Sequence, residues 1–341
     1  MRKYSKYVRL AFITLVLITG CQRIADEMVG KKPENAKTIN ITMVAKSSSN
    51  PVFLSARIGA EAAAEDLSDR YSMIDVNINW RTPLEENAEE QAERIRNAVV
   101  DGSDAIIVSC SDDSVLTKAI NFAVDRGVVV MTFDSDAPDS KRFAFYGPDD
   151  EKIGMNVMNE LAPLIDKKGK VAILGGSKSA PNLQQRVAGL KKAAADYDEI
   201  EVVGEFYHIE NAADAMAEVL RVNELYPDLK GWAMVGGWPF FSEEFIDLFE
   251  PGRMKIVAVD ALPVQLPYLE KGVVDVLLGQ PTYKWGEFCI QKIVDTLYLE
   301  KEVDEFNEMK LIRVSRENLG GWSRQLRAWG YNGIPDKYIV M

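Results

Sequence analysis

Short β-rich segments alternate with helical segments along nearly the whole chain, and no other feature constrains the fold as strongly. In the first half, β-branched and apolar residues cluster in predicted strands at 38–45, 73–80, 104–109 and 128–134. Between them, apolar residues recur every three or four positions in predicted helices at 51–67, 86–102 and 114–127. Segment 104–109 is apolar without alternation, which is typical of a strand covered on both faces.

The same alternation resumes after a polar segment at 134–142, which we interpret as a break between two halves. Further strands are predicted at 170–176, 200–207, 230–236, 255–260 and 274–280. Further helices are predicted at 150–166, 182–196, 211–225, 240–249, 263–271 and 283–301. Repeated β-α-β units form parallel sheets with helices on both faces. Because about ten strands would overfill one twisted sheet, we predict an α/β fold with two sheets.

The N-terminus has the character of a secretory signal. Four basic residues precede an apolar run at 11–20, which is about half the length needed to cross a bilayer. The run ends in Ile18-Thr19-Gly20-Cys21, which resembles the lipobox of bacterial lipoproteins. In those proteins the peptide is cleaved before the cysteine, which then carries the lipid. The alternatives are an ordinary signal peptide cleaved elsewhere and a simple N-terminal anchor.

We therefore predict a signal peptide at 1–20, a lipidation site at Cys21 and a polar tether at 21–37. The rest of the chain is then extracytoplasmic and held at the membrane by lipid alone. Removal of residues 1–20 changes the formal net charge from −12 to −16, because they carry four basic and no acidic residues. Nucleic acid and anionic lipid surfaces attract basic proteins, so neither is an expected partner.

The remaining cysteines and the single histidine indicate no metal site. Cys110 ends an apolar strand-like run and Cys289 lies in a helical one, which favours two buried free thiols over a disulfide. The chain has no CxxC motif, and His208 is its only histidine, so we expect no zinc and no other cofactor. We interpret His208 as a loop residue, with a ligand contact as the alternative.

Several motifs that would indicate catalysis are absent. The sequence has no GxxxxGK[ST] motif, no GxGxxG after a strand and no GxSxG. It is therefore expected to be neither the ATPase subunit of a transporter nor a triad hydrolase. A glycosidase that uses Asp134 and Asp260 as its two carboxylates is the enzymatic alternative.

Ligands of parallel α/β sheets bind beyond the carboxyl ends of the strands, and several polar or aromatic residues lie at such predicted ends. They are Asn50, Phe53, Trp80, Asp134, Trp238, Asp260 and Gln280. A carboxylate that loses water needs hydrogen-bond partners, and a neutral ligand with many hydroxyl groups would supply them.

From residue 38 to about 315 the chain resembles the periplasmic sugar-binding proteins of ABC importers, in particular those for ribose and galactose. The resemblance rests on the order and spacing of SSSNPVF, ERIRNAVVDGSDAIIVSCSD, VVVMTFDSD, GPDDEKIGMNVM, QQRVAGL, KIVAVDALP and VDVLLGQPTYKWGE. It implies a type I periplasmic binding fold, in which two Rossmann-like lobes close on a sugar. The lobes would comprise 38–147 plus 282–309 and 148–281 plus 310–341, joined by three crossings near 146–148, 280–281 and 310–312.

The family's sugar contacts near the first helix and at the strand ends carry over to this sequence. Asn50 and Phe53 match an Asn-Pro-x-Phe motif, in which the ring would stack on a sugar C–H face. Core packing beneath the first helix is the alternative for Phe53. Asp134 and Asp260 match the aspartates that accept hydrogen bonds from sugar hydroxyls, with turn residues as the alternative.

Arg186 matches a family arginine that would bind sugar oxygens and pair with Asp134 or Asp260; an exposed helical arginine is the alternative. Gln280 matches a glutamine whose amide both donates to and accepts from hydroxyls, with a solvated hinge residue as the alternative.

Three departures from the family pattern also concern the site. Ser135 stands where an arginine is common, Gly237-Trp238 where Asn-Asp is common, and Lys46 where a serine is common. The ligand is therefore not expected to be held just as ribose is. Trp238 either stacks on the ligand or packs against residues 239–241.

Together these features predict a lipid-anchored, monomeric receptor that delivers a monosaccharide or similar polyol to an ABC permease. In the alternative, the same fold presents the sugar to a membrane sensor kinase or chemoreceptor.

Overall fold

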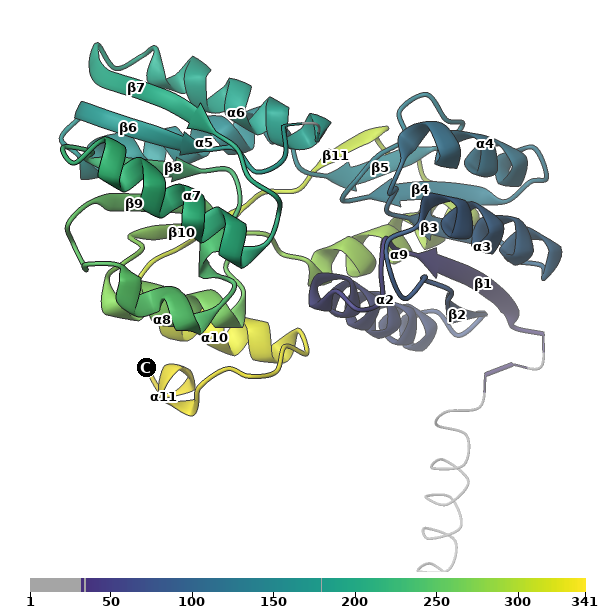
Figure 1. Ribbon diagram of the computed structural model, residues 1–341. Coiled ribbons are helices and arrows are strands. Elements are labelled where there is room, and N and C mark those ends of the chain that lie inside the picture. The colour runs from purple at the N-terminus through teal and green to yellow at the C-terminus, as the bar shows by residue number, and fades with distance from the viewer. Residues whose placement is uncertain (1–31, 34, 179) are drawn as a thin grey trace, which may run out of the picture.

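The computed structural model describes residues 32, 33, 35–178 and 180–341 (Figure 1). The predicted signal peptide, the lipidation site Cys21 and most of the predicted tether lie outside the described residues. No helix in the described part of the chain combines the length and the apolar character that a membrane crossing requires.

The first lobe is built on a six-stranded sheet with the order β11-β5-β4-β3-β1-β2, in which all neighbouring strands are parallel. Its strands are β1 (Lys37–Val44), β2 (Ile74–Trp80), β3 (Ala105–Val108), β4 (Val129–Phe133), β5 (Ala144–Gly147) and β11 (Phe306–Glu308). Helices α2 (Pro51–Arg70) and α9 (Tyr283–Leu297) pack together on one face, although more than 200 residues separate them in sequence. Helices α3 (Ala88–Val100) and α4 (Asp113–Val124) cover the other face.

The second lobe has a sheet with the order β12-β10-β9-β8-β6-β7, parallel except for the antiparallel edge strand β12. Its strands are β6 (Lys168–Leu174), β7 (Glu199–Phe206), β8 (Gly231–Met234), β9 (Lys255–Val259), β10 (Val276–Gly279) and β12 (Ile312–Val314). Helices α5 (Asp150–Leu164) and α6 (Pro181–Ala194) cover one face. The other face carries α7 (Ala212–Leu225), α8 (Leu266–Lys271), α10 (Leu319–Ala328) and the short α11 (Asp336–Ile339).

The predicted fold class, two α/β lobes with mainly parallel sheets flanked by helices, is therefore confirmed. The chain passes between the lobes three times, after β5, after β10 and after β11. Because β1, β4, β9 and β10 are all interior strands, the residues that follow them lie at the middle of each sheet's carboxyl edge.

Two local predictions were wrong. The helix predicted at 240–249 is a pair of 3-10 helices, η1 (Trp238–Phe240) and η2 (Glu243–Leu248). Phe240 and Phe249 both contact the Tyr268 ring, at centroid distances of 5.0 and 6.2 Å. Residues nine apart lie on opposite sides of an α-helix, so one continuous helix cannot bring both rings to Tyr268.

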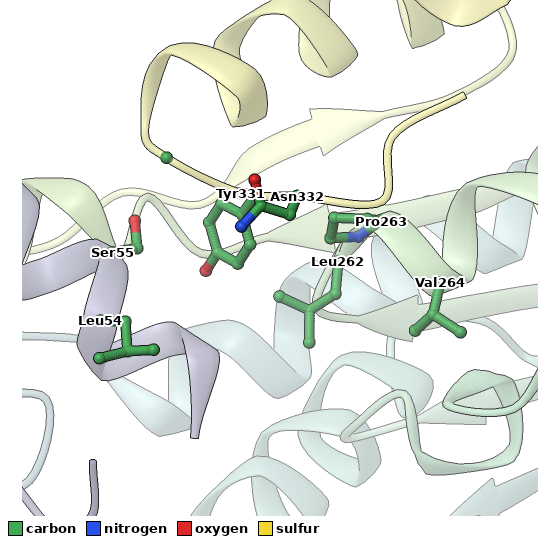
Figure 2. A pocket seen from close by; sticks show the side chains of 8 residues that line it. Leu54, Ser55, Leu262, Pro263, Val264, Tyr331 and Asn332 are labelled. Carbon is green, nitrogen blue, oxygen red and sulfur yellow. The ribbon is translucent and has the colours of Figure 1, made fainter. Parts of the chain in front are cut away.

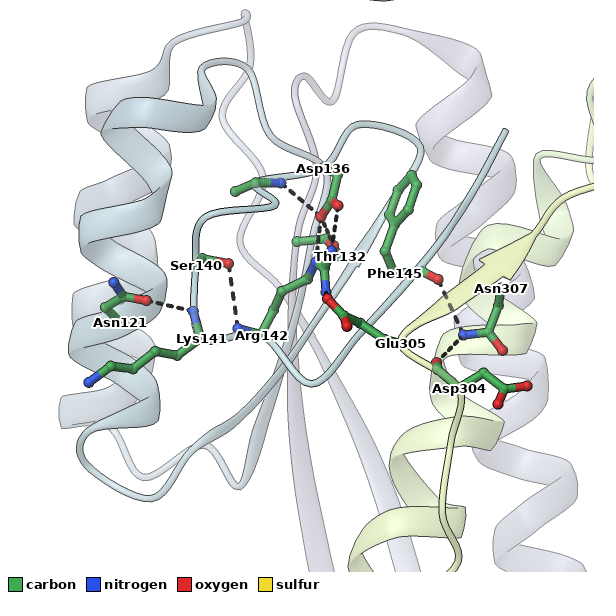
Figure 3. A network of polar contacts seen from close by, with 11 residues as sticks. Asn121, Thr132, Asp136, Ser140, Lys141, Arg142, Phe145, Asp304, Glu305 and Asn307 are labelled. Atoms are coloured by element: carbon green, nitrogen blue, oxygen red, sulfur yellow. Dashed lines mark hydrogen bonds and ion pairs between the residues drawn. The ribbon is translucent and has the colours of Figure 1, made fainter. Parts of the chain in front are cut away.

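The polar segment 134–142 does not separate the two halves, because it is a loop between β4 and β5 of the first lobe. Figure 3 shows what fixes it: Arg142 donates to Asp136 through Nε at 2.6 Å and Nη2 at 2.7 Å. The Thr132 hydroxyl donates to the same carboxylate, and Arg142 Nη1 reaches Glu305, just before β11, at 3.2 Å. These bidentate and charged contacts explain why a run of polar residues forms an ordered loop rather than a linker.

Candidate functional site

Two aspartates occupy equivalent places in the two lobes, one directly after β4 and one directly after β9. Asp134 and Asp260 both adopt positive φ, at 58° and 73°, a conformation that costs a non-glycine residue about 1 kcal/mol and that aspartate tolerates better than most. Loss of solvation and, as a smaller contribution, the charge of Asp134 raise the pKa of Asp260 in the other lobe, so the two carboxylates lie within electrostatic reach of each other. Strained residues of this kind gather at functional sites, where the surrounding structure holds them in place.

In the first lobe, Asp134 is held by groups from two other strand ends. Ser109 Oγ, after β3, donates to Asp134 Oδ2 at 2.7 Å. The Lys46 ammonium group, after β1, lies 3.8 Å from the same oxygen. Both side chains of the ion pair are about one fifth exposed, so the pair borders solvent and lends little stability. Lys46 thus stands beside a predicted site residue, where it neutralises part of the carboxylate charge.

Gln91 organises this edge of the first sheet and was not predicted as a site residue. Its buried amide nitrogen donates to the carbonyl oxygens of Ala45 and Ser109, both at 2.8 Å. Its amide oxygen accepts from Ser111 N at 3.0 Å. One side chain therefore joins the ends of β1 and β3. The only sequence signal is a polar residue on the apolar face of the helix, three positions after Ala88 and four before Ile95.

In the second lobe, Gln280 Nε2 donates to Asp260 Oδ1 at 2.7 Å. The amide oxygen of Gln280 is buried and accepts no hydrogen bond from the described residues. Loss of solvation raises the pKa of Asp260, although the Gln280 hydrogen bond and the Arg186 charge oppose this effect. The pair thus offers a carboxylate oxygen and an amide oxygen, both able to accept from hydroxyl groups.

Arg186 lies near this site, but its predicted ion pair with Asp134 or Asp260 is wrong. Its Nε donates to Asp150 Oδ1 at 2.7 Å, and its Nη1 donates to Val235 O at 3.0 Å. The cause is the close approach of α5 and α6, where a Cβ on Gly154 would overlap the Arg186 carbonyl oxygen. This approach brings the first turn of α5, with Asp150, beside the guanidinium group. Burial raises the pKa of Asp150, while the Arg186 charge opposes that effect.

The residues around the start of α2 have structural roles. Asn50 is exposed, and its side chain accepts from Val52 N at 3.1 Å as the helix cap. The Phe53 ring is 4% exposed and packs between Phe133 and Trp285, at centroid distances of 6.5 and 6.0 Å. This is the core position that the sequence analysis gave as the alternative for Phe53. Ligand contacts by Asn50 and Phe53 stay predictions.

Trp238 is mostly buried at the carboxyl end of β8. Its ring lies over Gly176 and Gly236, where an added Cβ at either glycine would overlap ring atoms. His208 meets it edge-on at a centroid distance of 5.0 Å. Of residues 239–241, Phe240 belongs to the core on the other face of the sheet, whereas Phe241 packs against the same core as Trp238. A ligand contact by the indole stays a prediction.

Neither cysteine nor acid clusters suggest a metal centre in the part of the chain that the structure describes. There, no group of three or more His, Cys, Asp or Glu side chains lies close enough to hold a metal ion. Cys110 and Cys289 are free and buried, as predicted, and burial raises the pKa of both thiols.

Comparisons with known proteins agree with this architecture. The family model described as "Periplasmic binding protein domain" matches residues 41–301. The D-ribose/D-allose-binding protein of Pseudomonas aeruginosa is 27% identical over 84% of this chain and 90% of its own length.

Two solved structures have the same fold. The sugar ABC transporter sugar-binding protein of Bacillus halodurans aligns with a TM-score of 0.75 at 23% identity, covering 83% of this chain and 98% of that one. A solute-binding protein of Burkholderia graminis in complex with D-arabinose aligns with a TM-score of 0.71 at 24% identity, covering 84% and 98%. On the match to its family model, the chain belongs to the periplasmic binding protein domain family.

Proposed function

We propose that this protein captures a sugar or a similar polyol between its two lobes and delivers it to an ABC importer. The observation that carries the proposal is the equivalent placement of Asp134 and Asp260 at the carboxyl ends of β4 and β9, one in each lobe, together with the Gln280 amide oxygen, which accepts no hydrogen bond from the described residues. Hydroxyl groups of a neutral polyol donate to such acceptors without adding a charge to a partly desolvated cleft. A relative named for ribose and allose and a solved structure in complex with D-arabinose support the same class.

We propose residues 38–147 plus 282–309 and 148–281 plus 310–341 as the two units that move against each other. The ligand favours the closed arrangement only by the amount that it binds that arrangement better. We further propose that Lys46, Asn50, Phe53, Arg186 and Trp238 contact the ligand together with the three acceptor residues.

The direct test is a thermal-shift screen of the mature chain against D-ribose, D-allose, D-arabinose and D-galactose, followed by calorimetric titration of each hit. A ligand that binds only the native form raises the melting temperature in proportion to the logarithm of its excess over Kd. Incubation with labelled oligosaccharides in parallel tests for turnover. Saturable binding without turnover supports a receptor function, whereas turnover would show that the protein is a glycosidase.

We propose that the mature protein is extracytoplasmic, monomeric and anchored by lipid on Cys21. The support is the lipobox-like sequence that ends the apolar run. The expected result is that a Cys21→Ser variant leaves the membrane fraction while the wild type stays in it. A variant that still sediments with membranes would rule out this anchor.

A further inference from the structure

A pocket of about 310 Å³ opens between the lobes beside the polar strand ends. Figure 2 shows Leu54 and Ser55 of α2 on one side and Leu262, Pro263 and Val264 of the second lobe on the other. Tyr331, from the segment between α10 and α11, lies between the two sides, and its hydroxyl points toward Ser55. The volume is at the lower end of the range for small-molecule sites, so it suits part of a ligand better than a second whole ligand.

Two of the residues that line the pocket are tied to segments that carry the proposed sugar site. Leu262 follows Asp260 by two residues, and the Tyr331 hydroxyl shares a hydrogen bond of 2.8 Å with Thr282, two residues after Gln280. Burial, together with the nearby Asp260 charge, raises the pKa of Tyr331 to about 12, against hydrogen bonds that lower it. The Asp260 carboxylate is thus close enough to the Tyr331 phenol at the pocket to act on it electrostatically.

The walls of the pocket are mainly apolar, with Ser55 and Asn332 as their two uncharged polar side chains besides Tyr331. Among the described residues, no ionisable side chain other than the Tyr331 phenol lines it, and that phenol shares a hydrogen bond with Thr282. The Leu54 side chain, 41% exposed at the start of α2, is apolar surface that a ligand could cover. A hydroxyl group placed against Leu54, Leu262 and Val264 would lose its water without gaining partners there, whereas an alkyl or aryl group would gain by burial.

On the basis of the proposed sugar binding, we propose that this pocket accepts the apolar aglycone of a glycoside. The substrate class is then that of small alkyl or aryl glycosides, whose sugar part binds at Asp134, Asp260 and Gln280. The competing outcome is that closure of the lobes brings Leu54 and Leu262 together and fills the pocket with protein. In that case an added alkyl group would obstruct closure and weaken binding.

The test compares the methyl and n-butyl glycosides, in both anomers, of D-ribose, D-allose, D-arabinose and D-galactose by calorimetric titration. Each buried methylene is expected to tighten binding about fourfold. Because Leu54 borders solvent and burial of the alkyl chain would be incomplete, we expect the butyl glycoside of the recognised sugar to bind about tenfold tighter than the methyl glycoside. Equal or weaker binding of the butyl compound would overturn the inference and leave sugar binding in place. If none of these sugars or glycosides binds, both the sugar assignment and the inference fall.

Two variants locate the effect. Leu54→Trp fills the pocket from α2, so the ratio of butyl to methyl affinity should fall to about one, whatever happens to the affinity for the free sugar. Leu220→Trp is the matched control, because Leu220 is 37% exposed on α7, outside the pocket. It should keep the tenfold ratio. A ratio that survives in Leu54→Trp would mean that the alkyl group binds elsewhere and would refute the assignment.

Discussion

Replacement of Asp260 by asparagine tests two effects of this carboxylate separately: its effect on the stability of the unliganded protein and its effect on the affinity for a sugar. Asparagine keeps the shape of the side chain and tolerates the φ of 73° at this position, which alanine does not. The change removes the charge but leaves an acceptor for the amide nitrogen of Gln280, which lies 2.7 Å from Oδ1. A hydrogen bond to a charged group contributes about 1.5–3 kcal/mol. If a sugar hydroxyl donates to this carboxylate, Asp260→Asn should weaken binding about 10- to 150-fold.

The stability of the unliganded protein should change in the opposite direction. Loss of solvation raises the pKa of Asp260 above its ordinary value of 3.8, so folding favours the protonated form. The stability contributed by this group is fully present below pH 3.8 and is lost as the pH rises through the folded-state pKa. At neutral pH the ionised carboxylate therefore opposes folding, and Asp260→Asn should unfold at the same or a higher temperature. The gain should vanish in acid, below the pKa of the unfolded state.

Calorimetric titration with a recognised sugar and thermal unfolding at pH 7 and pH 3.5 measure the two effects. Asp166→Asn is a matched control, because Asp166 is exposed, has a φ of 54° and lies in the turn before β6, outside the proposed site. It should leave both quantities unchanged. Sugar affinity that survives in Asp260→Asn within about threefold, or a clear loss of apo stability at pH 7, would refute the site assignment.

Three further outcomes follow from packing and charge. A Cβ on Gly286 of α9 would overlap the backbone of α2, so Gly286→Ala should lower the free energy of unfolding, measured in urea, by about 1–3 kcal/mol. Gly321→Ala in α10 is the control: its added Cβ meets no atom closer than 4.0 Å, so it should not destabilise the protein. Arg186→Met leaves the Asp150 carboxylate buried without its partner and should cost about 3–5 kcal/mol, while a second change of Asp150 to leucine should recover much of this loss. The Cys289 thiol, buried and with a raised pKa, should react with a maleimide only after denaturation. If Cys289 of the folded protein reacted as fast as a solvent-exposed thiol, that result would contradict its burial.

Most of the elements predicted from the sequence are long enough to show a periodicity, and one short strand was predicted without it. Strand β3 is a run of four fully buried apolar residues, and it was predicted from composition alone. Strands β11 and β12 have three residues each, and so short a segment has no readable period. Each is a strand only because it pairs with a strand of the sheet, β11 with β5 and β12 with β10. Helix α10 was missed because Gly320 and Gly321 indicate a loop, yet burial of Trp322 and Leu326 against the second sheet outweighs the cost of the glycines.

For the candidate site, the positions of residues were predictable and their partners were not. Asp134 and Asp260 follow directly from the ends of two buried strands. The pairing of Arg186 depends on how closely α5 approaches α6, which a small residue such as Gly154 decides by its lack of a Cβ. The sequence could not decide whether the Phe53 ring contacts a ligand or packs in the core, because its neighbours Phe133 and Trp285 come together only in the fold.

These partners also indicate why the ligand, rather than the protein, would close the lobes. Arg186 is neutralised by Asp150 within the second lobe, and Lys46 lies beside Asp134 within the first. Asp260 is bonded to Gln280 of its own lobe, so none of these contacts crosses the cleft. Closure without a ligand would bring Asp134 and Asp260 nearer to each other, and like charges repel more strongly as water leaves. In the proposed function, a polyol between them would donate hydrogen bonds to both carboxylates and replace that water, so the closed form would become favourable only when the ligand is present.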